Sequence, residues 1–204
     1  MPLQNRVDPF GNLFADASRG TLFGNRGGRF HNDDRTLGSR RYASRAWICC
    51  VLSFKGRQRD VWGRYYTELF FMDEPTALSA GHRPCFECRR KDALAFAEAF
   101  SGGHRRLSAP AMDKLLHEER LLGREKRIHR RPLDTLPDGV FVTLGGSDAF
   151  AVKGKSLLRW TPKGYADSRP RLAGIAADML TPPSIADALK RGYAPQWHPS
   201  AASL

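Results

Sequence analysis

The clearest pattern of apolar and polar positions lies in the middle of the chain. Residues 46–54 form a nearly continuous apolar run, and residues 60–72 are rich in aromatic and apolar positions. Both patterns predict strands, and Gly63 is expected to interrupt the second one. The first strand is expected to be buried, because its side chains offer no polar face to water.

Helix signals follow these two strands. Asp73 can accept a hydrogen bond from a first-turn N–H and Pro75 fits that turn, so a short helix is predicted that ends at Gly81. The spacing of apolar residues predicts a longer amphipathic helix over residues 89–100. A third helix is predicted over residues 110–122, after a capping serine.

Strand patterns return in the last third of the chain. Two β-prone runs separated by Gly-Gly-Ser-Asp predict a hairpin over residues 139–153, and a further strand is predicted over residues 156–161. A last short helix is predicted over residues 185–191. This mixture of strands and helices indicates the α+β class.

The same patterns divide the chain into three parts. Residues 1–45 are rich in Gly and Arg and show no period of 2 or 3.6, so we expect an irregular segment that packs on the core. Residues 46–100 are expected to form a small module around four cysteines. Residues 101–204 are expected to form a C-terminal α+β part, packed as one globular unit.

The chain is also strongly basic. Its 204 residues include 33 Lys and Arg against 21 Asp and Glu, which gives a formal charge of +12. Such a surplus usually meets an anionic partner, and nucleic acid, DNA before RNA, is the first candidate; a codon bias toward Arg is the alternative. No run of about 18 apolar residues exists and residues 1–10 lack a signal core, so we expect a cytoplasmic protein with no membrane partner.

The four cysteines carry the most specific chemistry. They do not form a disulfide framework, whereas Cys85 and Cys88 have the C-x-x-C spacing that can hold one Zn²⁺ ion. A redox role fits less well, because this C-x-x-C follows a helix and a glycine. Cys49 and Cys50 lie in a predicted strand and point to opposite faces, so only one, Cys50 by preference, is expected to join the pair. Four unliganded buried thiols are the alternative.

A tetrahedral zinc site needs a fourth ligand. His31 is one candidate for this position, and Cys49 is another. His82 lies only three residues before Cys85, so its geometry could exclude it. Asp34 is a poorer candidate.

The residues around the C-x-x-C motif follow a dense pattern, which consists of Ala77-Leu78, Ala80-Gly81, Arg83-Pro84-Cys85 and Cys88-Arg89. Together with Trp47-Ile48-Cys49-Cys50, this pattern resembles the zinc-binding N-terminal module of the Ada DNA-repair family. The resemblance covers about residues 46–92. It implies a zinc-thiolate module on DNA, with Arg83 and Arg89 placed to contact phosphate.

In the family, one zinc-bound thiolate accepts a methyl group irreversibly from a DNA phosphotriester, and Cys50 matches this acceptor by position. Phe54 stands where the family has a further cysteine, so the ligand set differs here. The Pro-Cys-His-Arg nucleophile motif of the family's alkyl-base transferase domain is absent from residues 101–204. The resemblance therefore concerns the zinc module and not a full Ada protein.

Basic residues beside these motifs are the candidate phosphate contacts. Arginines interleaved with aromatic residues such as Tyr65 and Tyr66 would combine phosphate neutralisation with base stacking. A solvated face is the alternative for the basic run over 120–131. The candidates are Arg45, Arg57, Arg59, Arg64, Arg83, Arg89, Arg90, Lys126, Arg127, Arg130 and Arg131.

The sequence thus predicts a zinc-containing, basic protein that binds nucleic acid and is linked to the handling of DNA damage. One alternative is a metal-dependent enzyme acting on nucleic acid, by methyl transfer to Cys50 or by phosphodiester cleavage with clustered carboxylates. Another alternative is a structural zinc protein whose basic surface binds an acidic protein partner.

Overall fold

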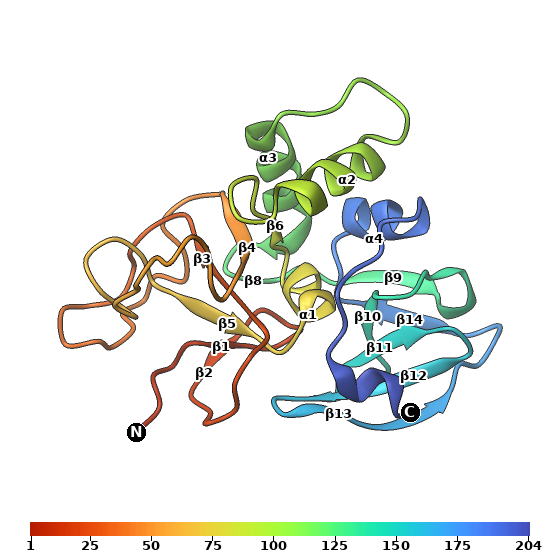
Figure 1. Cartoon of the computed structure of the whole chain (residues 1–204). Coiled ribbons are helices and arrows are strands. Elements are labelled where there is room, and N and C mark those ends of the chain that lie inside the picture. The colour runs from red at the N-terminus through yellow and green to blue at the C-terminus, as the bar shows by residue number, and fades with distance from the viewer.

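The computed structural model describes residues 1–204 and shows an α+β fold with two six-stranded sheets (Figure 1). The first sheet, on the left of Figure 1, has the strand order β2-β1-β5-β3-β4-β6. Its strands are β1 (Arg6–Val7), β2 (Leu13–Phe14), β3 (Leu22–Arg26), β4 (Trp47–Val51), β5 (Leu69–Phe71) and β6 (Arg83–Pro84).

The second sheet, on the right of Figure 1, is antiparallel and has the order β13-β12-β11-β10-β14-β9. Its strands are β9 (His129–Pro132), β10 (Phe141–Thr143), β11 (Phe150–Lys153), β12 (Ser156–Thr161), β13 (Gly164–Pro170) and β14 (Ala176–Met179). A separate two-stranded ribbon pairs β7 (Leu121–Leu122) with β8 (Glu125–Lys126).

The helices are α1 (Glu74–Ser79), α2 (Arg90–Ser101), α3 (Ala109–Arg120) and α4 (Pro183–Lys190). The Asp73 carboxylate accepts a hydrogen bond from the Thr76 N–H at 3.0 Å, so the predicted cap of α1 is confirmed. Ser108 caps α3 in the same way. No helix has both the length and the apolar character that crossing a bilayer requires.

The largest hydrophobic core lies between helices α2, α3 and α4 and one face of the second sheet, and includes Phe96, Met112, Val140 and Ile185. A smaller core lies under the first sheet and α1. Cys49 belongs to that smaller core, whereas Cys50 packs with Phe23 and Cys85 in a separate cluster. The two faces of β4 therefore have different surroundings.

Several sequence predictions are confirmed. The apolar run at 46–54 contains β4, the predicted hairpin at 139–153 is β10 and β11, and the strand at 156–161 is β12. The helix expected at 110–122 ends at Arg120, because the next two residues enter β7.

Two predictions for strands and loops are wrong. Residues 60–68 form turns rather than strand: Trp62 has a φ of +58°, which a strand does not allow, and its N–H donates to the Glu68 carboxylate. Within residues 1–45, where irregular chain was expected, β3 occupies an interior place in the first sheet between β5 and β4. Its polar Asn25 and Arg26 are buried, so no apolar pattern marked it.

Candidate functional site

The backbone of the first sheet brings three cysteines together. β6 pairs in parallel with β4, with Cys49 opposite Pro84, and the Cys85 N–H donates to the Cys49 carbonyl at 2.9 Å. The chain then turns before α2, which places Cys88 next to Cys85. The sulfurs of Cys50, Cys85 and Cys88 all lie within 4.8 Å of one another. This separation suits three ligands of one tetrahedral metal ion.

Cys49 points to the other face of β4 and lies outside this group, so its assignment as an alternative ligand is wrong. Its side chain is fully buried, and the Arg89 Nη1 lies 3.4 Å from its sulfur. Burial raises the pKa of the Cys49 thiol. Alternation along the strand thus selects Cys50, as the sequence predicted.

Hydrogen bonds among the three thiols favour thiolates at the C-x-x-C. The Cys50 thiol donates to Cys85, and this bond is the main cause that lowers the pKa of Cys85 to about 5. A bond from Cys50 also lowers the pKa of Cys88, and the backbone N–H of Glu87 approaches the Cys85 sulfur at 3.4 Å. The same bonds raise the pKa of Cys50. The cluster is therefore poised to exchange protons for a cation.

The histidines proposed as fourth ligands are elsewhere. His31 stacks on Trp62 with ring centroids 5.1 Å apart, and its Nδ1 lies 2.7 Å from the Thr67 hydroxyl, so it does not join the cysteines. His82 is buried on the opposite face of the sheet, against Trp47 and Phe71. The fourth position of the thiol group is thus not filled by a histidine.

A pocket of about 550 Å³ opens beside the three sulfurs. We call it the thiol pocket, and its lining includes Cys50, Cys85, Cys88, Arg57, Arg59, Asp60, Arg64, Tyr65, Tyr66 and Glu68. Tyr65 and Tyr66 expose 72% and 49% of their surface. Three of the arginines expected to contact nucleic acid and both tyrosines therefore lie around the thiols.

The arginines of the thiol pocket differ in the exposure and the contacts of their guanidinium groups. Arg57 is exposed and pairs with Glu87 at 2.6 Å. Arg59 lies over the Phe23 ring at 4.0 Å and donates to the Leu52 carbonyl, which fixes its guanidinium. Arg64 is exposed and approaches only the Tyr65 ring.

Two other predicted phosphate contacts are wrong, because their guanidinium groups are buried and already paired. Arg83 makes two hydrogen bonds of 2.8 Å to the Asp113 carboxylate. Arg89 donates to Glu74 and Asp92, both at 2.8 Å. Both arginines connect elements of the fold and are not free for a phosphate.

The remaining basic candidates do not border the thiol pocket. Arg90 is exposed at the start of α2, and Arg45 is exposed before β4. Arg127, Arg130 and Arg131 are exposed beside or on β9. Lys126 is half-buried and donates to the Ser79 carbonyl. Lys126 lines a second pocket together with Arg120, which belongs to the same basic run, and with Arg26, which the sequence analysis did not connect to it.

Carboxylates do not form a comparable metal site. Cys50, Cys85 and Cys88 are the one group of three or more potential ligands within such distances in the chain. Phosphodiester cleavage by clustered carboxylates therefore has no structural support here. In comparisons with protein-family models, curated proteins and solved structures, the chain matched none.

Proposed function

We propose that this protein binds nucleic acid, DNA in preference to RNA, through a surface organised by a zinc ion on Cys50, Cys85 and Cys88. The observation that carries the proposal is the position of these three thiols on the wall of a pocket whose rim bears arginines and exposed tyrosines. The resemblance of residues 46–92 to the Ada zinc module supports the same function. From the same resemblance, we further propose a role in the handling of DNA damage.

The donor set suits zinc. Thiolate sulfur is a preferred zinc ligand, and two of the three thiols have a lowered pKa, so they lose their protons readily. Three protein ligands leave one coordination position for water or a substrate atom, as in catalytic zinc sites. All three cysteines line the thiol pocket, so a molecule in this pocket could reach a zinc ion that they would hold.

The rim of the thiol pocket has the chemistry of a nucleic-acid surface. Arg57 and Arg64 are exposed cations that can neutralise phosphates. Tyr65 and Tyr66 present aromatic faces on which unpaired bases can stack. Charge and stacking thus meet within one pocket, which favours a single-stranded or opened segment over an intact duplex.

A second candidate function is methyl transfer to one of the thiolates. The observation in its favour is that all three cysteines line the thiol pocket and that Cys88 is only half-buried. A thiolate lone pair would attack the methyl carbon of a phosphotriester, forming an S–C bond while the C–O bond breaks and the phosphodiester leaves as an anion. Mass spectrometry after incubation with methylated DNA tests this step, because transfer adds about 14 Da to one cysteine.

A salt series of binding to a single-stranded oligonucleotide tests the main proposal. Each phosphate contact adds about 0.7 to the slope of log affinity against log salt, so the Arg57→Gln/Arg64→Gln double variant should lower the slope by about 1.4. The Arg105→Gln/Arg106→Gln variant removes equal charge from an exposed loop after α2 and should leave the slope near that of the wild type. A flat wild-type slope would contradict nucleic-acid binding and favour an acidic protein partner.

A further inference from the structure

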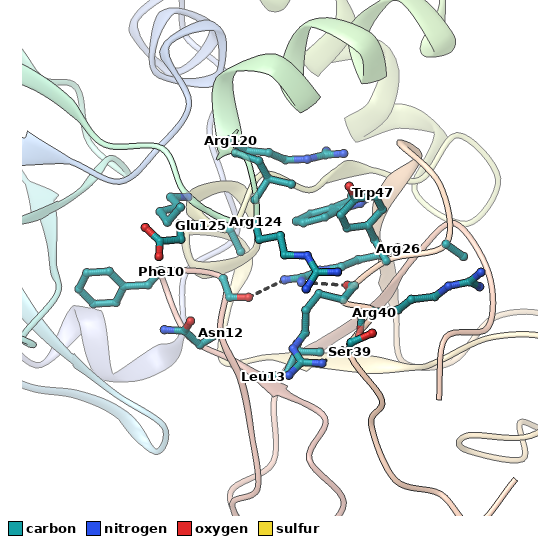
Figure 2. A pocket seen from close by; sticks show the side chains of 17 residues that line it. Phe10, Asn12, Leu13, Arg26, Ser39, Arg40, Trp47, Arg120, Arg124 and Glu125 are labelled. Atoms are coloured by element: carbon teal, nitrogen blue, oxygen red, sulfur yellow. Dashed lines mark hydrogen bonds between the residues drawn. The ribbon is translucent and has the colours of Figure 1, made fainter. Parts of the chain in front are cut away.

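A second pocket, of about 690 Å³, lies on the other face of the first sheet (Figure 2). Asn25 and Ile48 line the thiol pocket, whereas their neighbours Arg26 and Trp47 line the second one, because successive residues of a strand point to opposite faces. We call it the arginine pocket, since its lining includes the cations Arg26, Arg40, Arg41, Arg120, Arg124 and Lys126.

These six cations have almost no negative partners. Glu125 is the single carboxylate in the lining, and none of the six forms a salt bridge anywhere in the chain. Arg83 and Arg89, which are equally buried, are paired with carboxylates. Among the buried arginines, the absence of a carboxylate partner is therefore particular to this pocket.

Two of the cations form its inner wall. Arg26 and Arg120 expose 2% and 1% of their surface. Trp47 lies between them, with the Arg26 Cζ 3.9 Å and the Arg120 Cζ 3.8 Å from the centroid of its ring (Figure 2). Arg26 donates to the Gly11 and Arg41 carbonyls, and Arg120 donates to the Gly81 and Arg45 carbonyls. These carbonyls, with His82 Nε2 and His117 Nδ1, orient the guanidinium groups without forming an ion pair, and Asp8 and Asp113 act on them only from a distance.

Further observations indicate that the positive charge of this pocket is not balanced within the fold. The Arg120 Nε is buried without a hydrogen-bond partner. Burial also lowers the pKa of Arg26 and of Arg120 to about 9, and that of Lys126 to about 7. A buried cation of this kind is costly unless a negative group approaches it. If the arginines served the fold alone, carboxylate partners such as those of Arg83 would meet the same need at lower cost.

From this juxtaposition of unpaired cations around one cavity, we propose that the arginine pocket binds a terminal phosphate group, carried by a molecule of nucleotide size. Guanidinium groups recognise phosphate oxygens in a bidentate manner, and several from different segments can surround one phosphate. The volume suits a ligand of that size, and Phe10, Leu13 and Tyr42 supply apolar walls for the part that bears the phosphate. Neither zinc nor the thiol pocket takes part, so this site stands or falls independently of the proposed function.

The test measures binding by calorimetry and thermal shift at constant ionic strength. Adenosine 5′-monophosphate is the probe, and adenosine is the control that lacks the phosphate. A second pair of probes, short oligonucleotides with a 5′-phosphate or a 5′-hydroxyl, separates a free nucleotide from the end of a strand as the source of the phosphate. We expect the phosphorylated member of at least one pair to bind at least about tenfold more tightly and to raise the Tm.

Variants connect the binding to the pocket. Arg40 and Arg124 are exposed at its rim, so Arg40→Ser/Arg124→Ser should fold normally and weaken phosphate binding by at least about tenfold. Arg105→Ser/Arg106→Ser removes the same charge elsewhere and should bind as the wild type does. Arg120→Met probes the inner wall. The proposal is overturned if no phosphorylated probe binds, if adenosine binds equally well, or if both double variants weaken binding alike.

Discussion

The two faces of the first sheet hold pockets of opposite electrostatic demand. On one face, Cys50, Cys85 and Cys88 supply three sulfur ligands that suit a cation. On the other face, Arg26, Arg120 and Lys126 supply positive charge that calls for an anion. Both pockets use the same two strands, β3 and β4, whose successive side chains point to opposite faces of the sheet.

The buried arginines fall into two groups that differ in their hydrogen-bond partners. Arg83 and Arg89 lie near the C-x-x-C and are satisfied by carboxylates within the fold. Arg26 and Arg120 have no carboxylate partner and instead contact carbonyls and the His82 and His117 rings. The paired arginines serve stability, whereas the unpaired ones leave binding capacity for a ligand.

The largest effect is expected when the carboxylate partner of a buried arginine is removed. Asp113→Ala would leave Arg83 buried without a counter-charge, so we expect the free energy of unfolding to fall by about 3–5 kcal/mol. Urea unfolding of the variant measures this loss. Asp178→Ala is the matched control, because Asp178 pairs with an exposed Arg130 at 3.9 Å and should cost less than about 1 kcal/mol. Equal losses in the two variants would contradict a larger contribution of the buried Arg83–Asp113 pair to stability.

A smaller effect is expected from the tyrosines at the rim of the thiol pocket. Tyr65→Ala should weaken binding of a single-stranded oligonucleotide by about 1–3 kcal/mol through lost stacking. The salt slope should stay unchanged, because no phosphate contact is lost. Fluorescence anisotropy titrations at several salt concentrations measure both quantities. A steep change of slope would mean that the ring positions Arg64 instead of stacking on a base.

The smallest effect concerns pH and the arginine pocket. The pKa of Lys126 is lowered to about 7 in the fold, mainly by burial, while an unfolded lysine titrates near 10.4. Between these values unfolding takes up a proton, so the destabilisation caused by the buried ammonium is relieved as pH rises. Well below pH 7 the destabilisation is complete and no longer depends on pH.

Relative to Lys126→Met, the wild type should therefore gain about 1–2 kcal/mol of unfolding free energy between pH 7 and pH 8.5. Urea unfolding of both proteins across this range gives the difference. Added phosphate should reduce the gain, because an anion beside the lysine restores its proton affinity. A constant difference across the range would show that Lys126 stays protonated in the fold.

Sequence patterns predict the features of this protein that a few consecutive residues determine. The C-x-x-C motif, the Asp73 cap and the alternation of Cys49 and Cys50 are each set by a few consecutive residues, and the structure confirms them. The roles of Arg83 and Arg89 were misjudged, because their partners Asp113 and Glu74 lie 30 and 15 residues away. A pairing at such distance leaves no periodic trace in the chain.

The arginine pocket was missed for the same reason. Its cations come from the end of β3, from the segment around residues 40–41 and from the α3–β8 region, and only the folded chain brings them together. β3 itself was hidden, because Gly24, Asn25 and Arg26 contribute no apolar pattern although the strand is buried. The one available signal was the surplus of arginine, which indicates an anionic ligand but gives no position.

The metal content of the purified protein tests the account most directly. The wild type should carry about one zinc ion per chain, and so should Cys49→Ser, whose thiol points into the core. Cys50→Ser and Cys85→Ser should each lose most of the metal, since they remove a ligand from the group of three. A wild type with less than about half a zinc ion per chain, or a Cys50→Ser variant that keeps its zinc, would contradict the account.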